Sequence, residues 1–195
     1  MTLLCSSVDE AVCGVHDGST VLVGGFGTAG MPFALIDALI RQGARDLTVV
    51  SNNAGNADTG LAALLAAGRV RKIVCSFPRQ TDSWVFDELY RSGKIELEVA
   101  PQGNLAERMR AAGAGIGGFY TRTGVGTLLA EGKETREIEG RTYILELPIA
   151  ADVALISAHT ADTVGNLVYR KTARNFAPVM ATAATTTIVQ VQHVV

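Results

Sequence analysis

The sequence predicts an α/β fold in which helices cover both faces of an open, mostly parallel sheet. Short continuous apolar runs such as Val21-Leu22-Val23 are typical of strands that are buried on both faces. These runs alternate with segments in which apolar residues keep helical spacing. The 21 glycines against 5 prolines also fit a fold with many short turns. Strands that alternate with helices form a parallel sheet through right-handed crossovers, which is a Rossmann-like arrangement.

The alternation begins near the N-terminus. Two serines and Asp9 precede a short helix that carries Val12. The strand at 21–23 follows this helix. Pro32 then occupies a first helical turn, where its missing N–H costs nothing, and apolar residues continue at helical spacing. Gly43 closes this second helix as a C-terminal cap.

The same alternation continues through the middle of the chain and then breaks. The run 95–99 alternates like a strand with one exposed face, and glycines at 93 and 113 end the helices on either side of it. Residues 113–132 are rich in glycine and threonine and predict no regular element. The remaining expected elements are strands at 47–50, 72–75, 143–145, 153–156 and 188–195, and helices at 61–67, 82–90 and 105–112.

Composition narrows the classes of function. A chain of 195 residues, 48% of them hydrophobic, suits one domain, and we expect a single domain over 1–195. A net charge of -2 with interspersed signs offers no basic face, which argues against nucleic acid as a partner. No apolar run approaches the roughly 18 residues of a membrane helix, and the N-terminus lacks a signal-peptide pattern. We therefore expect a cytoplasmic protein without a membrane partner.

The cysteines predict neither a metal site nor a disulfide framework. Cys5, Cys13 and Cys75 are spaced unlike metal ligands, and their odd number leaves one thiol without a partner. We expect buried, unreactive thiols in a reducing compartment.

The glycine-rich segment after the first strand is the strongest functional signal. It consists of Gly24, Gly25, Phe26, Gly27, Thr28, Ala29 and Gly30. A strand, a tight turn and a helix N-terminus in this order form the geometry that receives a phosphate or another anion. The letters from Gly25 to Gly30 match the G-x-G-x-x-G of dinucleotide-binding loops, but the second strand ends in Ser51-Asn52-Asn53, without the carboxylate that holds the ribose. The lysine of nucleotide-hydrolysing phosphate loops is also absent, so the segment favours neither a nicotinamide-dependent oxidoreductase nor an ATPase.

The glycine-rich segment and six further segments together resemble the α subunits of family I CoA-transferases. The resemblance starts at Asp17-Gly18, runs through Phe26, and includes Gly30 and Pro32. It covers almost the whole chain, with the motifs in the same order. The other matching segments are SNNAG (51–55), PQGNLAER (101–108), GGFYT (117–121), GVGT (124–127), KETRE (133–137) and GNLVYR (165–170).

The resemblance implies half of an enzyme. CoA transfer between carboxylic acids needs a carboxylate nucleophile that takes the acyl group and then holds CoA as a thioester. In the family this nucleophile is a glutamate in a Ser-Glu-Asn-Gly segment of the β subunit, and this chain contains no such segment. We therefore expect no catalytic residue in this chain and no metal. We also expect a partner β subunit, in a heterodimer or α2β2 assembly, and coenzyme A and succinyl-CoA as substrates rather than a permanently bound cofactor.

Within the family the chain is most similar to the branch that acts on 3-oxoadipate. The segments 51–56 and 75–80 resemble that branch, and the passage from Thr127 to Lys133 lacks a longer insert of the enzymes that act on acetoacetate. The implied reaction moves CoA from succinyl-CoA to a 3-oxoacid, with 3-oxoadipate as the expected acceptor. Acetoacetate or a short-chain fatty acid is the alternative acceptor, because substrate preference depends on few pocket residues.

The resemblance also implies roles for individual residues. The segment Gly24–Gly30 is expected to lie against CoA, and Gln102 to contact the carboxylate of the acid substrate as a neutral donor. Asn52 and Asn53, at the C-terminal end of a strand, would line the acyl pocket. The structural alternatives are a tight turn without a ligand, a locally bonded amide at Gln102, and Asx turns before Gly55.

Two arginines are candidates for the distal end of a dicarboxylate. Arg79 and Arg170 carry guanidinium groups, which bind carboxylates bidentately. Ordinary ion pairs are the alternative for both.

A non-catalytic binding module of similar fold is the alternative of another class. The same open sheet occurs in sugar-phosphate isomerases and in regulators that sense sugar phosphates. Those proteins would need a lysine and acidic residues around the turn, and no such cluster accompanies Gly24–Gly30. The chain ends at Val195 in a strand-like run, whereas family α subunits continue further, so we expect a truncated or disordered C-terminus.

Overall fold

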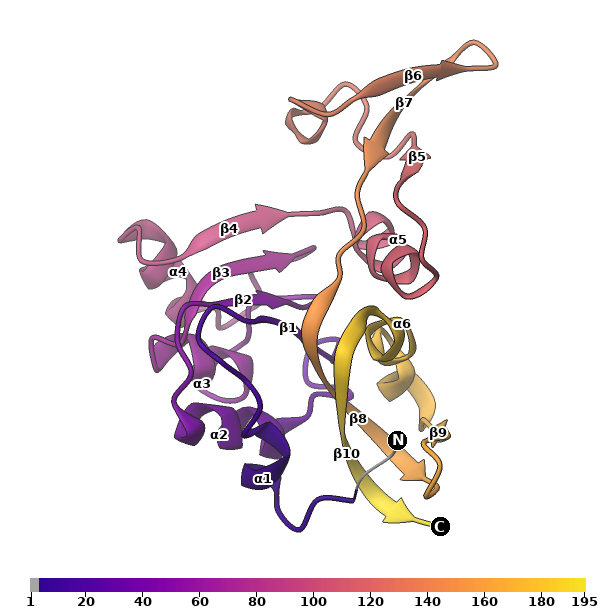
Figure 1. Ribbon diagram of the computed structural model, residues 1–195. Coiled ribbons are helices and arrows are strands. Elements are labelled where there is room, and N and C mark those ends of the chain that lie inside the picture. The colour runs from indigo at the N-terminus through magenta and orange to yellow at the C-terminus, as the bar shows by residue number, and fades with distance from the viewer. Residues whose placement is uncertain (1–3) are drawn as a thin grey trace.

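The computed structural model describes residues 4–195 and shows a central sheet flanked by helices (Figure 1). The strands of this sheet are β1 (Thr20–Val23), β2 (Leu47–Val50), β3 (Val70–Cys75), β4 (Glu96–Val99), β8 (Ala151–Ala161), β9 (Leu167–Val168) and β10 (Ala184–Val194). Their order is β10-β8-β1-β2-β3-β4, and every neighbouring pair in this path is parallel, whereas β9 pairs antiparallel with β8. The predicted α/β fold with a mostly parallel sheet is confirmed.

Helices cover both faces of this sheet, as predicted. The helices are α1 (Val8–Val12), α2 (Phe33–Gln42), α3 (Leu61–Ala66), α4 (Trp84–Arg91), α5 (Gln102–Gly113), α6 (Ala177–Ala183) and the short 3-10 helices η1 (Leu128–Ala130) and η2 (Lys171–Arg174). Figure 1 shows α1 to α4 on one side of the sheet and α5 and α6 on the other. Gly43 ends α2 with a φ of 98°, which confirms the predicted left-handed cap.

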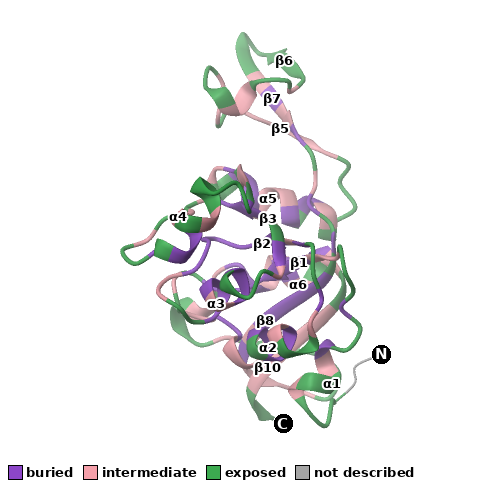
Figure 2. Cartoon of the chain, turned by 90° about the vertical axis from the view of Figure 1, so that its left-hand side faces the viewer, coloured by how far each residue is buried: buried purple, intermediate pink, exposed green. Residues whose placement is uncertain are grey.

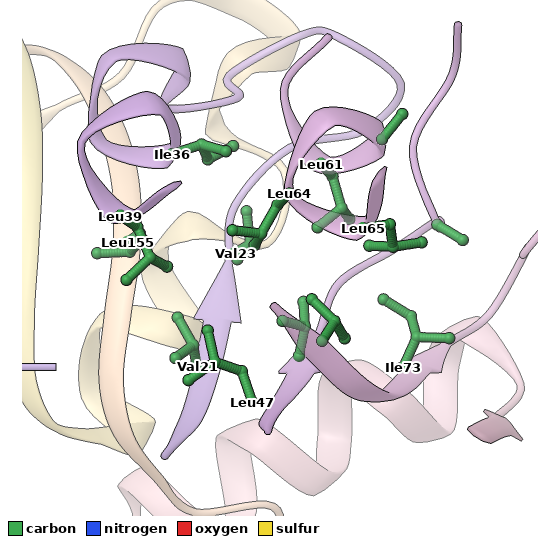
Figure 3. Packing of buried hydrophobic residues seen from close by; sticks show 14 of the residues in the cluster. Val21, Val23, Ile36, Leu39, Leu47, Leu61, Leu64, Leu65, Ile73 and Leu155 are labelled. Carbon is green, nitrogen blue, oxygen red and sulfur yellow. The ribbon is translucent and has the colours of Figure 1, made fainter. Parts of the chain in front are cut away.

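Alternate residues of β1 divide the core between the two faces of the sheet. Val21 and Val23 pack with residues of α1 to α4, whereas Leu22 packs with α5 and α6. Figure 3 shows the first of these clusters, in which Ile36 and Leu64 cover the strands. Val21, Leu22 and Val23 are fully buried, which explains the continuous apolar run in the sequence. Figure 2 shows that burial is concentrated in the sheet and in the inner faces of the helices.

Helix α5 begins at Gln102, earlier than the predicted start at Leu105. The N–H of Leu105 donates to the carbonyl oxygen of Pro101 at 2.8 Å, which is an early bond of this helix. Proline is favoured at helix starts because its fixed φ suits the first turn. The sequence indicated a loop here because the polar run after Pro101 shows no apolar spacing. Gln102 therefore lies in a first helical turn rather than in a loop.

A second sheet stands away from the central one. It consists of β5 (Phe119–Thr121), β6 (Thr135–Ile138) and β7 (Arg141–Glu146), which pair antiparallel in the order β5-β7-β6. Figure 1 places this sheet beyond α5, and Figure 2 shows that much of it is exposed. The sequence predicted only the strand at 143–145. The strand β6 was missed because it is exposed throughout and lies in a charged run without apolar alternation.

A buried carboxylate connects the second sheet to α5. Glu146, the last residue of β7, is only 3% exposed. Its Oε1 accepts hydrogen bonds from Lys133 Nζ at 2.6 Å and from Asn104 Nδ2 at 3.1 Å. Arg108 Nε lies 3.9 Å from Oε2 of the same carboxylate. Buried charges persist only where such partners surround them.

The ion pairs continue from α5 to the central sheet. Arg108 Nη1 donates to Glu98 Oε1 at 2.9 Å, and Lys72 Nζ donates to Glu98 Oε2 at 2.6 Å. Burial raises the pKa of Glu98, but the hydrogen bonds and charges of Lys72 and Arg108 outweigh it, so that the pKa lies below its ordinary value. Residues of β3, β4, α5 and β7 thus form one chain of contacts.

The C-terminal part contains more regular structure than the sequence predicted. The strand expected at 188–195 is confirmed as β10, which begins earlier, at Ala184. The elements β9, η2 and α6 were not predicted. Helix α6 buries Ala177, Met180 and Ala183, but it is too short for its spacing to stand out in an alanine- and threonine-rich stretch.

The cysteines differ in exposure. Cys75 is buried, as expected, whereas Cys5 and Cys13 are exposed, so the expectation of buried thiols is wrong for these two. Cys13 follows α1, a helix whose only buried residue is Val12. In the described part of the chain, residues 4–195, no helix is long and apolar enough to cross a bilayer.

Candidate functional site

The segments that follow four neighbouring strands meet at one edge of the central sheet and surround a pocket. The glycine-rich segment follows β1, Asn52 follows β2, Ser76 follows β3, and Gln102 follows β4. Open parallel sheets bind ligands at the edge formed by their carboxyl ends. The pocket has a volume of about 550 Å³ and is lined by Phe26, Gly27, Asn52, Ser76, Phe77, Gln80 and Gln102.

The glycine-rich segment folds into a tight turn at this pocket. The main-chain groups of Phe26 and Ala29 bond each other twice, at 3.0 Å and 3.2 Å. Gly27 between them has a φ of 58°, which L side chains rarely adopt. Within residues 4–195, the N–H groups of Gly27 and Thr28 at the tip make no hydrogen bond. The turn therefore offers free backbone donors, which is what a carbonyl or an anion needs.

A segment far along the sequence holds this turn in place. A Cβ added at Gly30 would lie 2.5 Å from the carbonyl oxygen of Ala173, so only glycine permits this approach. The side-chain amide of Asn175 donates from Nδ2 to the carbonyl oxygen of Ala29 at 2.9 Å. Sequence reasoning missed Asn175, although the motif at 165–170 lies just before it.

Polar side chains from three strand ends bond one another in the pocket. Asn52 Oδ1 accepts hydrogen bonds from Gln102 Nε2 at 2.8 Å and from Ser76 Oγ at 2.9 Å. The single proton of this hydroxyl is shared with the main-chain carbonyl oxygen of Asn52, which lies 3.1 Å from Ser76 Oγ. The structure thus brings together Asn52 and Gln102, which sequence reasoning selected, and adds Ser76, Phe77 and Gln80, which it noted only within the segment 75–80.

Asn53 occupies a different position from Asn52. It is 1% exposed, and its Oδ1 accepts a hydrogen bond from the N–H of Gly55 at 2.8 Å, which is the Asx turn considered from the sequence. It is not among the residues that line the pocket. Within residues 4–195, Asn53 Nδ2 and the neighbouring Ser51 Oγ are buried without a hydrogen-bond partner. The end of β2 therefore carries unsatisfied polar atoms, which are rare in folded proteins.

The charged side chains lie outside the pocket. Arg79 Nε donates to Asp87 Oδ1 at 2.7 Å in a surface ion pair, which matches the alternative considered for this arginine. Neither Arg79 nor Arg170 lines the pocket, and no charged side chain from residues 4–195 does so. The groups that this chain offers to a bound carboxylate are therefore neutral amides, hydroxyls and backbone N–H groups.

Other regions of the molecule are weaker candidates for a functional site. A second hollow of about 530 Å³ lies along α4 and is lined by Trp84, Asp87, Glu88, Arg91 and Ser92. It involves one helix and no meeting of strand ends. No group of three or more His, Cys, Asp or Glu side chains in residues 4–195 is arranged to hold a metal ion. We therefore place the candidate site at the strand ends.

Comparisons with known proteins address the chemistry of this site. The family model described as coenzyme A transferase matches residues 5–195. The chain is 71% identical to a 3-oxoadipate CoA-transferase subunit from Pseudomonas putida, over 97% of this chain and 82% of that protein. It is 50% identical to a Bacillus subtilis (strain 168) protein named as a probable succinyl-CoA:3-ketoacid coenzyme A transferase subunit, over 100% of this chain and 81% of that protein.

Solved structures show where the same architecture occurs. The chain resembles a chain of a variant of the decarboxylase AibA/AibB with a TM-score of 0.86 and 28% identity, over 100% of this chain and 77% of that chain. The same architecture therefore occurs in proteins named for different reactions. Sequence similarity consequently says more about the reaction of this chain than the fold does. With a family model that spans residues 5–195 and a relative that is 71% identical, the chain belongs to the coenzyme A transferase family.

Proposed function

We propose that this chain is the α subunit of a heteromeric CoA-transferase that moves CoA from succinyl-CoA to 3-oxoadipate. The observation that carries the proposal is the pocket in which the glycine-rich segment meets the neutral amides of Asn52 and Gln102. The acceptor is supported by the 71% identity to a protein named for 3-oxoadipate, against 50% to one named for 3-ketoacids. The name of the second relative supports succinyl-CoA as the donor.

The pocket binds substrate, and a partner supplies the covalent chemistry. Its lining, within residues 4–195, contains no carboxylate that could act as the nucleophile. In the proposed scheme the thioester carbonyl of succinyl-CoA is attacked by a glutamate of the β subunit, which expels the CoA thiolate and forms an acyl-glutamyl anhydride. The thiolate then attacks the glutamyl carbonyl, releases succinate and forms a glutamyl-CoA thioester. The same steps in reverse order with the acceptor carboxylate yield the new CoA ester and free glutamate.

The residues of this chain have binding roles in this scheme. The glycine-rich segment forms the wall on the CoA side, where the free N–H groups of Gly27 and Thr28 can meet a carbonyl or a phosphate. Gln102 and Asn52 donate to the carboxylate of the acid, and Asn53 supports the end of β2 behind them. As part of the same proposal, residues 1–195 act as one domain, and the reaction takes place in the cytoplasm without a permanently bound cofactor.

Reconstitution with the β subunit tests this proposal. We expect no transferase activity from the isolated chain, and succinyl-CoA-dependent activity when both subunits are mixed. The acceptors 3-oxoadipate, acetoacetate and acetate are then compared in the same assay, and 3-oxoadipate should give the highest kcat/KM. Robust CoA transfer by the isolated chain would contradict the proposal that the β subunit supplies the nucleophile. A preference for acetoacetate would replace the proposed acceptor.

The substitution Gln102→Ala tests the acid-binding role directly. A hydrogen bond to a charged group contributes about 1.5–3 kcal/mol, so its loss should lower kcat/KM for 3-oxoadipate roughly ten- to hundredfold. Gln192→Ala is the matched control, because Gln192 is exposed and its Oε1 bonds His159 Nδ1, away from the pocket. Unchanged kinetics of the Gln102→Ala enzyme with every acid would remove the role assigned to this residue.

A further inference from the structure

We propose that Ser76 is a positioning residue that orients the amides of Asn52 and Gln102 so that their N–H groups face the carboxylate of the acid substrate. The proposal rests on the proposed function, because it takes a carboxylic acid as the occupant of this pocket. It goes further by explaining how a pocket with a neutral lining selects an anion.

The hydrogen bonds at Asn52 determine which of its atoms remain available. Its Oδ1 accepts from Ser76 Oγ at 2.9 Å and from Gln102 Nε2 at 2.8 Å. An amide oxygen has two acceptor positions, so these two donors occupy it fully. Asn52 Nδ2 has no hydrogen-bond partner among residues 4–195, and the residue lines the pocket. The free atom of this side chain is therefore its nitrogen, which is a donor.

Gln102 also keeps a free hydrogen-bond donor. One of its two N–H groups is used by Asn52, so one N–H and the amide oxygen remain. Together the two side chains keep more free donors than free acceptors at the pocket. An ionised carboxylate only accepts hydrogen bonds, so it fits this arrangement, and no buried cation is needed to bind it.

Ser76 takes part in the arrangement of the amides that the structure shows. The oxygen and nitrogen of an asparagine amide exchange places when the group rotates by half a turn, and the hydrogen bonds around it decide which orientation holds. A rotated Asn52 would present Nδ2 to Gln102 Nε2, donor against donor, unless Gln102 rotated as well, and it would turn its oxygen toward the substrate. In the orientation that the structure shows, the hydroxyl of Ser76 donates to Oδ1 and holds this oxygen away from the acid.

The side chain of Ser76 can be removed without removing the local backbone structure. The main-chain carbonyl of Asn52 accepts from the N–H groups of Ser76 at 3.2 Å and Phe77 at 3.0 Å. These bonds tie the segment after β3 to the segment after β2, and they do not involve the hydroxyl. Ser76→Ala should therefore still fold, with a melting temperature lowered only by the loss of the part-buried hydrogen bond of its hydroxyl.

The test uses the enzyme reconstituted from both subunits. For Ser76→Ala we expect kcat/KM for 3-oxoadipate to fall about three- to tenfold, mainly through KM, because one neutral hydrogen bond is lost and the amides lose their fixed orientation. Ser76→Thr keeps a hydroxyl and should restore most of the loss. The matched control is Ser92→Ala, which removes an exposed hydroxyl that donates to the carbonyl of Leu89 at 3.2 Å, and it should behave as the unmodified enzyme.

The double variant separates positioning from a direct contact with substrate. If Ser76 acts through Gln102, then Ser76→Ala combined with Gln102→Ala should lose less than the product of the two single losses. The positioning role would be overturned if the loss of kcat/KM in the double variant equalled the product of the two single losses. It would also be overturned if Ser76→Thr failed to restore kcat/KM. If the Ser76→Ala enzyme had the kinetic constants of the unmodified enzyme while the Gln102→Ala enzyme was impaired, only the positioning role of Ser76 would be overturned. An unimpaired Gln102→Ala enzyme would instead overturn the acid-binding role in the proposed function.

Discussion

At the scale of single residues, burial decides which cysteine reacts. Burial raises the pKa of the Cys75 thiol from 9.0 to about 12, against a smaller lowering by a hydrogen bond from the Phe77 backbone. Cys5 and Cys13 are exposed. Because the thiolate is the reactive form, iodoacetamide at about pH 8 should label Cys5 and Cys13 in the native protein and Cys75 only after unfolding. Peptide mass spectrometry measures this, and rapid native labelling of Cys75 would contradict the assigned burial.

The same thiol links stability to pH. Between pH 9.0 and about 12 the unfolded chain releases the Cys75 proton, whereas the folded chain keeps it. Its contribution to the free energy of unfolding is therefore fully present below the unfolded pKa and is lost as pH rises toward the folded pKa. Cys75→Ala removes this titration. Its melting temperature should decline less steeply above pH 9.0 than that of the unmodified chain.

Residues of the site differ in how far the sequence could reveal them. Asn52 and Gln102 stand in recognisable segments after predicted strands, and parallel strands bring such segments to one edge. Asn175 bonds a carbonyl oxygen 146 positions earlier, and nothing in the local pattern marks that contact. Ser76 was not selected because its role depends on the orientation of another side chain. Long-range polar contacts of this kind need the three-dimensional structure.

At the scale of elements, the glycine-rich segment combines an unusual backbone with a close contact. Gly30 has a φ of 75° and lies against Ala173, whereas Gly18 has a φ of 78° and no atom within 4 Å of an added Cβ. Gly18→Ala should therefore measure the backbone cost alone, about 1–2 kcal/mol. Gly30→Ala should cost more in urea unfolding and should also abolish transferase activity in the reconstituted enzyme. Equal losses of stability in the two variants would contradict the close contact at Gly30.

The elements themselves were predictable where burial leaves a pattern. The strand at 47–50 and the helix from Leu61 match the sequence prediction closely, because most residues of both are buried. The strands β5 and β6 were not predicted, since they are short and carry no apolar alternation. Such strands form because β7 offers them a partner, and pairing between distant segments leaves little trace in the sequence of either one.

At the scale of the whole molecule, ion pairs connect the second sheet to the central one. The path runs from Lys133 and Glu146 through Arg108 to Glu98 and Lys72. In this path only Glu146 is almost fully buried, so the ion pairs of Glu146 should contribute most to the stability of the connection. The second sheet packs little apolar surface of its own, as the exposure in Figure 2 indicates. We infer that these charges, more than hydrophobic packing, hold it in position.

The substitution Lys133→Met tests this inference. It leaves the buried carboxylate of Glu146 without its shortest ion pair, and breaking one side of a buried pair costs about 3–5 kcal/mol. Arg71→Met is the matched control, because it breaks the exposed ion pair with Glu96, which is worth about 0–1 kcal/mol. Hydrogen-exchange mass spectrometry should show faster exchange across β5 and β7 in Lys133→Met, while β1 to β3 stay protected. If exchange instead rose equally in the central sheet, or stayed unchanged in β5 and β7, then apolar packing rather than Glu146 would hold the second sheet.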